Sequence, residues 1–95
     1  MDNQKMDEFY LKFKERLDDT TEFPSKFIYK FIIPTTHKGI AEVHRIFDGA
    51  DPQFQLKESR TGKYTSVTVT VFVIDADQVI HYYREAASIQ DIIML

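Results

Sequence analysis

The sequence predicts an α+β domain in which four strands and two helices follow one another as β-α-β-β-α-β, behind one further helix. Three observations lead to this prediction. Residues 27–33 and 64–73 have the β-branched and aromatic content and the alternation of strands. Residues 40–47 and 75–88 have apolar residues at helical spacing. The length of 95 residues fits one compact domain.

The first predicted element is an amphipathic helix between Met6 and Leu17. Its apolar residues recur at three- and four-residue spacing, and charged residues fill its other side. The polar residues 18–22 separate it from Phe23-Pro24, where a helix does not easily continue. We therefore divide the chain into an N-terminal helix with its linker, residues 1–22, and a globular domain, residues 23–95. The apolar side of this helix consists of Met6, Phe9, Tyr10, Phe13 and Leu17.

The first strand of the globular domain is predicted at residues 27–33, which stop at Pro34. Alternation places its aromatic residues on one face and Ile28, Lys30 and Ile32 on the other. After Thr35-Thr36 the apolar period lengthens to three or four residues, which predicts a helix that stops at Asp48-Gly49. The buried stripe of this helix is Ile40, Val43, Ile46 and Phe47.

A hairpin is predicted next, with a short strand at residues 53–57, a turn at residues 59–62, and a long strand at residues 64–73. The long strand alternates more regularly than any other segment. Its valines form one face and point toward the core. Its other face carries Tyr64, Ser66, Thr68, Thr70 and Phe72.

The last two predicted elements are a helix capped by Asp75 and ended by Ser88, and a strand over residues 89–95. The helix buries Val79, one of its two adjacent tyrosines, and Ala86. The complete order is that of the split-βαβ, ferredoxin-like arrangement. We therefore expect a four-stranded antiparallel sheet with two helices on one face.

Three segments resemble the YbeD-like family of small bacterial proteins of unknown function. They are Glu22-Phe23-Pro24, residues 27–32 with their Tyr29-Lys30 pair, and residues 58–67 with their Gly-x-Tyr-x-Ser-Val pattern. The resemblance covers residues 22–95 and leaves out the N-terminal helix. It implies a ferredoxin-like fold similar to that of the ACT domain, an amino-acid-sensing regulatory module.

The loop between the first strand and the first core helix is a candidate ligand site, formed by Thr35, Thr36, His37 and Gly39. Two hydroxyls, an imidazole and the free amides of a helix start would suit a carboxylate or phosphate. Residues 39–43 also resemble the start of the first ACT helix, around which an amino acid is often held, although Lys38 replaces the usual proline. The structural alternative is that the threonines cap the helix.

The amino-acid composition limits the kinds of molecule that the protein is expected to bind. Residues 1–22 hold four Lys/Arg and seven Asp/Glu, whereas residues 23–95 hold eight of each. A neutral domain with no basic block disfavours general nucleic-acid binding. There is no cysteine, and no apolar run approaches a membrane span or a signal peptide. We expect a cytoplasmic protein with no membrane partner and with no cofactor.

The only concentrated positive patch is the second hairpin, with Lys57, Arg60, Lys63 and Tyr64. It could meet an acidic partner or RNA, although Glu58 lies inside it. RNA-recognition modules of this fold stack bases on paired aromatic residues of the third strand. Ser66, Thr68 and Thr70 follow Tyr64 on its face, so this pairing is missing. RNA binding is kept as the second alternative function.

No spacing in the chain predicts a metal site or a catalytic site. His37 and His44 lie two helical turns apart, but no further ligand is placed by spacing to complete a metal shell. The serines have no histidine in a nucleophile motif, and the aspartates occupy turn and helix-start positions. We therefore expect neither a bound metal nor an enzymatic activity.

The remaining candidate is the sheet face opposite the valines, which we call the open face. It is a mixed apolar and polar surface that needs a cover. That cover is either the N-terminal helix, through Phe9, Phe13 and Leu17, or a second copy in a homodimer. We expect a noncatalytic regulatory or protein-interaction domain that binds through this face, and the first alternative is an amino-acid sensor. The open face is predicted to consist of Ile28, Lys30, Ile32, Ser66, Thr68, Thr70 and Phe72.

Overall fold

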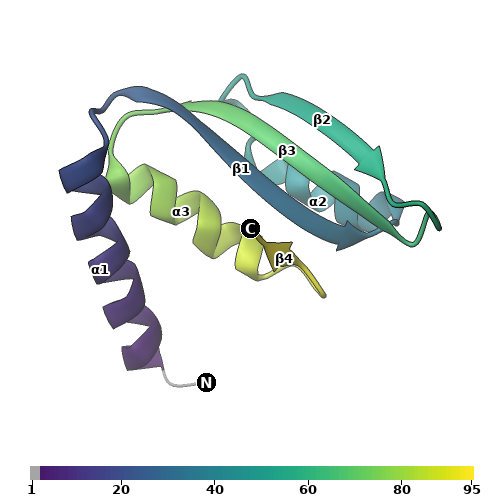
Figure 1. Ribbon diagram of the computed structural model, residues 1–95, viewed down its shortest axis with the longest axis horizontal. Helices are drawn as coiled ribbons and strands as arrows, with labels where there is room; N and C mark the ends of the chain where they lie inside the picture. The colour runs from purple at the N-terminus through teal and green to yellow at the C-terminus, as the bar shows by residue number, and fades with distance from the viewer. Residues whose placement is uncertain (1–2) are drawn as a thin grey trace.

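The computed structural model describes residues 3–95, which form three helices and one antiparallel sheet of four strands (Figure 1). The strand order in the sheet is β2-β3-β1-β4. Helices α2 and α3 lie on one side of the sheet, and α1 lies beside α3 (Figure 1). The predicted α+β architecture with a four-stranded antiparallel sheet is therefore confirmed. The elements are α1 (Asn3–Thr20), β1 (Ser25–Pro34), α2 (His37–Ile46), β2 (Gln53–Glu58), β3 (Tyr64–Val73), α3 (Ala76–Ala87) and β4 (Ile93–Met94).

Local side-chain chemistry sets the starts of the two central helices. The Thr36 hydroxyl accepts a hydrogen bond of 3.0 Å from the amide of Gly39 at the start of α2. The Asp75 carboxylate accepts one of 2.8 Å from the amide of Gln78 at the start of α3, so the predicted cap is confirmed. Each bond satisfies an amide that has no partner within its own helix.

The register of the sheet places the two faces as the alternation predicts. Tyr29 lies opposite Val69 and Phe31 opposite Val67, and all four side chains are buried under the helices. Ile28 lies opposite Thr70 on the other face. The valines of β3 thus point toward α2 and α3, because burying a β-branched side chain stabilises the fold by roughly 1.5–3 kcal/mol.

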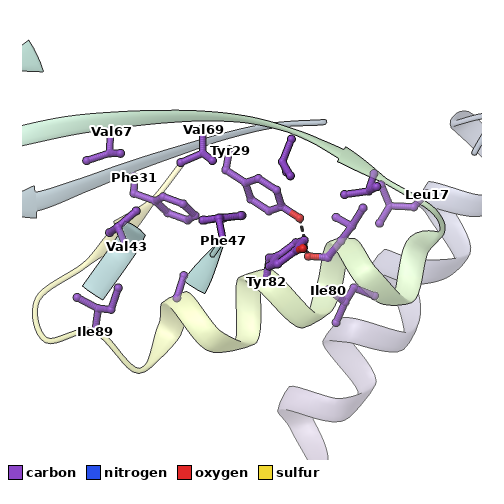
Figure 2. Close-up of a cluster of buried hydrophobic side chains, with 14 of the residues drawn as sticks. Leu17, Tyr29, Phe31, Val43, Phe47, Val67, Val69, Ile80, Tyr82 and Ile89 are labelled. Carbon is purple, nitrogen blue, oxygen red and sulfur yellow. Dashed lines mark hydrogen bonds between the residues drawn. The ribbon is translucent and has the colours of Figure 1, made fainter. Parts of the chain in front are cut away.

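Four aromatic rings form the centre of the core between sheet and helices (Figure 2). The Phe47 ring lies 5.2 Å from that of Tyr29 and 4.7 Å from that of Tyr82, measured between centroids. Tyr29 also stacks on Phe31 at 5.8 Å. These contacts join β1, the end of α2 and the middle of α3, so the core depends on three segments that are distant in sequence.

The Tyr29 hydroxyl is buried and donates a hydrogen bond of 2.9 Å to the backbone carbonyl of Val79 in α3 (Figure 2). Burial raises the pKa of Tyr29 because it disfavours the phenolate, and the neighbouring Tyr83 and Tyr82 raise it further. Burial raises the pKa of Tyr83 for the same reason.

These shifts predict a loss of stability at alkaline pH. A phenol whose pKa is raised by folding stabilises the protein fully below its unfolded pKa, near 10, and this stabilisation is lost as the pH rises. We expect the free energy of unfolding to fall above about pH 10. Tyr29→Phe should lower it by about 0.5–1.5 kcal/mol at pH 7 and make the alkaline decline less steep. Urea unfolding at pH 7 to 11 measures both effects, and an equally steep decline in the variant would contradict the assignment.

Helix α1 packs against α3, which contradicts the hypothesis that it covers the open face. Arg84 of α3 pairs with Asp7 at 3.1 Å, and Lys14 of α1 pairs with Asp77 of α3 at 3.0 Å. Asp77 raises the pKa of Lys14, first through its hydrogen bond and then through its charge. The position of α1 depends on these ion pairs and on apolar residues of α3. Because these partners lie on another helix, the sequence pattern of α1 alone does not predict where α1 packs.

The apolar side of α1 is buried only in part. Tyr10 and Leu17 belong to the core cluster, and the Phe13 ring lies 5.6 Å from that of Tyr83. Phe9 was expected on the buried side, but its side chain is 62% exposed. The prediction of a single continuous apolar stripe is therefore wrong at this position, because neither α3 nor the short β4 covers Phe9.

The last strand is shorter than its apolar composition predicts. Only Ile93 and Met94 pair with β1, whereas residues 89–95 were expected to be extended. Ile89 is buried in a turn, where its amide bonds to the Ala86 carbonyl at 3.0 Å, and Asp91 has a φ of 60°. Apolar composition thus identified a buried segment, but it did not distinguish a strand from a turn that packs on the core.

Candidate functional site

The sheet register brings together the residues predicted for the open face. Across β1 and β3, Ile28 lies opposite Thr70, Lys30 opposite Thr68, and Ile32 opposite Ser66. These three pairs form adjacent rungs in the middle of the sheet. Phe72 joins them one rung further along, opposite Lys26.

Both neighbouring strands extend this face. On the β2 side, Gln53, Gln55 and Lys57 lie opposite Thr70, Thr68 and Ser66, respectively. On the β4 side, Ile93 lies opposite Ile32. The predicted face did not include Lys26, Ile93 or these three residues of β2. Lengthening the first predicted strand by one residue would have found Lys26, whereas Ile93 required the register of β4.

The open face is exposed, and its apolar side chains are not clustered in a core. Ile28 is 58% exposed and Phe72 is 56% exposed. Ser66, Thr68 and Thr70 between them are half-buried. Among residues 3–95, no helix lies over this side of the sheet (Figure 1). Exposed apolar residues surrounded by hydroxyl and amide groups are typical of surfaces that bind other molecules.

The charged side chains at the strand positions of the open face are all lysines. Lys26, Lys30 and Lys57 are its charged members, and none of its strand positions within residues 3–95 carries a carboxylate. None of the three lysines takes part in an ion pair in that part of the chain. The protein as a whole has a formal charge of −3. The centre of the face is therefore positive on an acidic protein, which would favour an acidic partner. Two carboxylates, those of Glu58 and Asp51, line hollows at the two ends of the face.

The two aromatic residues on the outer side of β3, Tyr64 and Phe72, lie at opposite ends of the strand. Tyr64 pairs with Pro34 and Phe72 pairs with Lys26, so the whole strand separates the two rings. At roughly 3.4 Å per residue this is about 27 Å, much more than the distance between stacked bases. The structure thus places no adjacent pair of stacking rings on this face within residues 3–95.

A hollow lies between the base of the basic hairpin and the open face. The turn contains Gly62 with a φ of 74°, which explains the glycine at this position. The hollow, of about 360 Å³, includes Lys57, Tyr64 and the carboxylate-bearing Glu58, but not Arg60 or Lys63. The four residues of the predicted basic patch therefore do not line one cavity together, and RNA binding through them stays a prediction.

The residues of the candidate ligand loop have different surroundings. Some form hydrogen bonds within the protein, and some line a cavity. The Thr35 and Thr65 hydroxyls are hydrogen-bonded to each other at 2.8 Å, and Thr36 caps α2. Thr36 and Gly39 line a cavity of about 470 Å³ between the start of α2 and the segment after α3, whereas Thr35 and His37 do not. Lys38, Glu42 and Asp91 supply charges of both signs to this cavity. Binding of an amino acid here stays a prediction.

The histidines occupy separate environments. His44 stacks on Phe54 with ring centroids 4.0 Å apart and planes 5° from parallel. His81 lies near Glu85 on the exposed side of α3. Within residues 3–95, no group of three or more His, Cys, Asp or Glu side chains is placed to hold a metal ion. None of the helices described is long and apolar enough to cross a membrane.

Comparisons with known proteins identify relatives but no activity. Residues 18–95 match the model of a family described as protein of unknown function (DUF493). A protein of Serratia proteamaculans (strain 568), described as UPF0250 protein, is 32% identical over 85 residues, which cover 86% of this chain and 98% of the relative. The predicted relationship to the YbeD-like proteins is confirmed, since this is the same family. No solved structure matches the chain.

Proposed function

Because this chain belongs to the DUF493 family of proteins of unknown function, we propose that it is a noncatalytic protein-interaction domain that binds a partner through its open sheet face. Such a domain would act by occupying or regulating its partner. The observation that carries this proposal is the set of three lysines, Lys26, Lys30 and Lys57, on an exposed surface that also presents Ile28 and Phe72. An interface needs apolar area for affinity and charge complementarity for specificity.

The fold type supports a binding role, and we assign it to the ferredoxin-like class. After α1, the elements follow one another as β-α-β-β-α-β, and both central helices lie on one face. The order β2-β3-β1-β4 puts the two longest strands, β1 and β3, in the middle of the sheet. This leaves their outer side chains as a central surface that a folded partner can cover.

A photo-crosslinking experiment tests the open face as an interface. A benzophenone side chain at position 72, introduced into the full chain, should give a discrete adduct in a lysate of the source cells. Thr68→Glu should lower the adduct yield by roughly five- to tenfold, because the new carboxylate would offset the charge of Lys30 directly opposite and would repel an acidic partner. The mass of the adduct distinguishes a second copy of this chain from another protein.

Matched controls make the crosslinking result specific to the face. The same benzophenone at His81, which is exposed on α3, should give no such adduct. Gln90→Glu, which adds an equal charge away from the open face, should leave the yield at position 72 unchanged. An adduct that forms equally well with Thr68→Glu would refute the proposal.

A further inference from the structure

One edge of the sheet is only partly paired. Strand β1 has ten residues, but β4 pairs with only Phe31 and Ile32. The amide of Leu95 adds one more bond, of 2.9 Å, to the Lys30 carbonyl. Within residues 3–95, no strand pairs with residues 25–29 on this side of β1. An unpaired strand edge is a template for strand addition.

Two backbone hydrogen bonds show which groups of β1 point toward this edge. Lys30 bonds toward β4, whereas Thr35 bonds to Lys63 on the β3 side. Successive residues of a strand alternate between its two neighbours. The amides and carbonyls of Lys26 and Ile28 therefore point toward the unpaired edge, and they can form up to four hydrogen bonds with one added strand.

An apolar groove lies in the helix layer at the end of β4. It has a volume of about 270 Å³, and α1, α3 and the last residues of the chain line it. The Tyr83 ring on its wall lies 4.8 Å from the Tyr29 ring and 6.2 Å from the Phe27 ring, which places the groove next to the helix-facing side of β1. The lining residues are Phe9, Tyr10, Phe13, Tyr83, Met94 and Leu95.

The position of α1 explains why this groove exists. Helix α1 extends the helix layer beyond α3, but the sheet above does not extend with it, because β4 is so short. Phe9 is consequently 62% exposed, although it lies beside the partly buried Phe13. A strand that continued the line of β4 would place every second side chain over these rings.

We propose that the unpaired edge of β1 and this groove together bind an extended acidic segment of another protein by strand addition. The segment would continue the line of β4, antiparallel to β1. Its residues opposite Tyr29 and Phe27 would be apolar and would enter the groove. Its residues opposite Ile28 and Lys26 would be acidic, since Lys26 and Lys30 flank these positions without ion pairs among residues 3–95.

Charge favours an acidic segment over a second copy of this chain. Pairing two β1 edges around a twofold axis would bring Lys26 and Lys30 of both copies onto the same face. Like charges on adjacent strands are destabilising. The carboxylates of an acidic strand would offset the charges of the same lysines. The backbone hydrogen bonds to the edge of β1 would be the same as with a second copy.

This inference goes beyond the proposed function, because it concerns the edge of the sheet and not its open face. The test uses the full chain and a synthetic peptide, acetyl-Leu-Glu-Leu-Glu-Thr-Thr-amide. The peptide should slow hydrogen exchange of the Lys26 and Ile28 amides about tenfold at saturation. Exchange of the Phe27 and Tyr29 amides, which already face β3, should not change.

Matched variants and peptides distinguish strand addition from nonspecific electrostatic or apolar binding of the peptide. Phe9→Ser should weaken peptide binding roughly five- to tenfold, whereas Leu11→Ser, an exposed residue of the same helix outside the groove, should not. Replacing both glutamates of the peptide with lysine should weaken it by about tenfold or more. The inference fails if the acidic peptide does not bind, if it binds without protecting the two amides, or if the free protein dimerises with these amides already protected. The crosslinking experiment with Thr68→Glu tests the open face and not the edge of β1, so its result does not depend on any of these three outcomes.

Discussion

Replacing Phe47 with alanine is expected to lower the free energy of unfolding by about 3–5 kcal/mol. Phe47 is fully buried at the end of α2 and contacts aromatic rings from three other elements, those of Tyr29, Phe54 and Tyr82. Alanine would remove the apolar surface of the ring and leave a cavity that rigid strands on one side cannot fill. Because a domain of this size is stable by only about 5–10 kcal/mol, we expect a large fall in the urea midpoint.

Phe72→Ala is the matched control for this prediction. The same ring is removed, but from the open face, where Phe72 is more than half exposed. We expect the free energy of unfolding to change by less than about 0.5 kcal/mol. If the two variants were equally destabilised, the assignment of the two sheet faces would be wrong. A small effect of Phe72→Ala would also show that the open face can be altered without unfolding the protein.

The second large effect is expected for Leu17→Ala, which should lower the free energy of unfolding by about 2–4 kcal/mol. Leu17 lies near the end of α1 and is 6% exposed, within the core cluster that α3 and β1 also form. Removing its side chain would weaken the attachment of α1 to the rest of the domain. Urea unfolding followed by circular dichroism measures the change.

Leu11→Ala is the control, since Leu11 belongs to the same helix and is 57% exposed. Its substitution should change the free energy of unfolding by less than about 0.5 kcal/mol. A Leu17→Ala variant as stable as the wild type would mean that α1 is not part of the core. The pair of variants thus tests whether the N-terminal helix is an integral element or an attachment that could be removed without cost.

Much of the fold could be predicted from local patterns. Alternation over residues 64–73 identified both the strand and its buried valine face, and the Asp75 cap identified the start of α3. The open face was predicted from the same alternation, and the register places Ile28, Lys30 and Ile32 beside β3 as expected. These features depend on residues that are close together in sequence.

The candidate sites were less predictable because they depend on contacts between distant segments. The loop from Thr35 to Gly39 was predicted as one cluster, but its two hydroxyls bond to Thr65 and to the start of α2, and of the predicted residues only Thr36 and Gly39 line the cavity. The basic hairpin was likewise predicted as one patch, and its hollow includes only part of it. Residue spacing places side chains on the same loop, but the direction of each side chain follows from its own hydrogen bonds.

The sequence by itself determined the order of the elements, the two faces of the sheet and the starts of the central helices, because hydrophobic period and helix capping act over a few residues. Only the tertiary structure decided that α1 packs on α3 and that β4 pairs with just two residues of β1. Both outcomes depend on contacts between segments that lie far apart in the chain. Leu17 and Ile89 are buried against residues that their own local sequence does not specify. The exposed lysine-lined edge of β1 results from these two outcomes together.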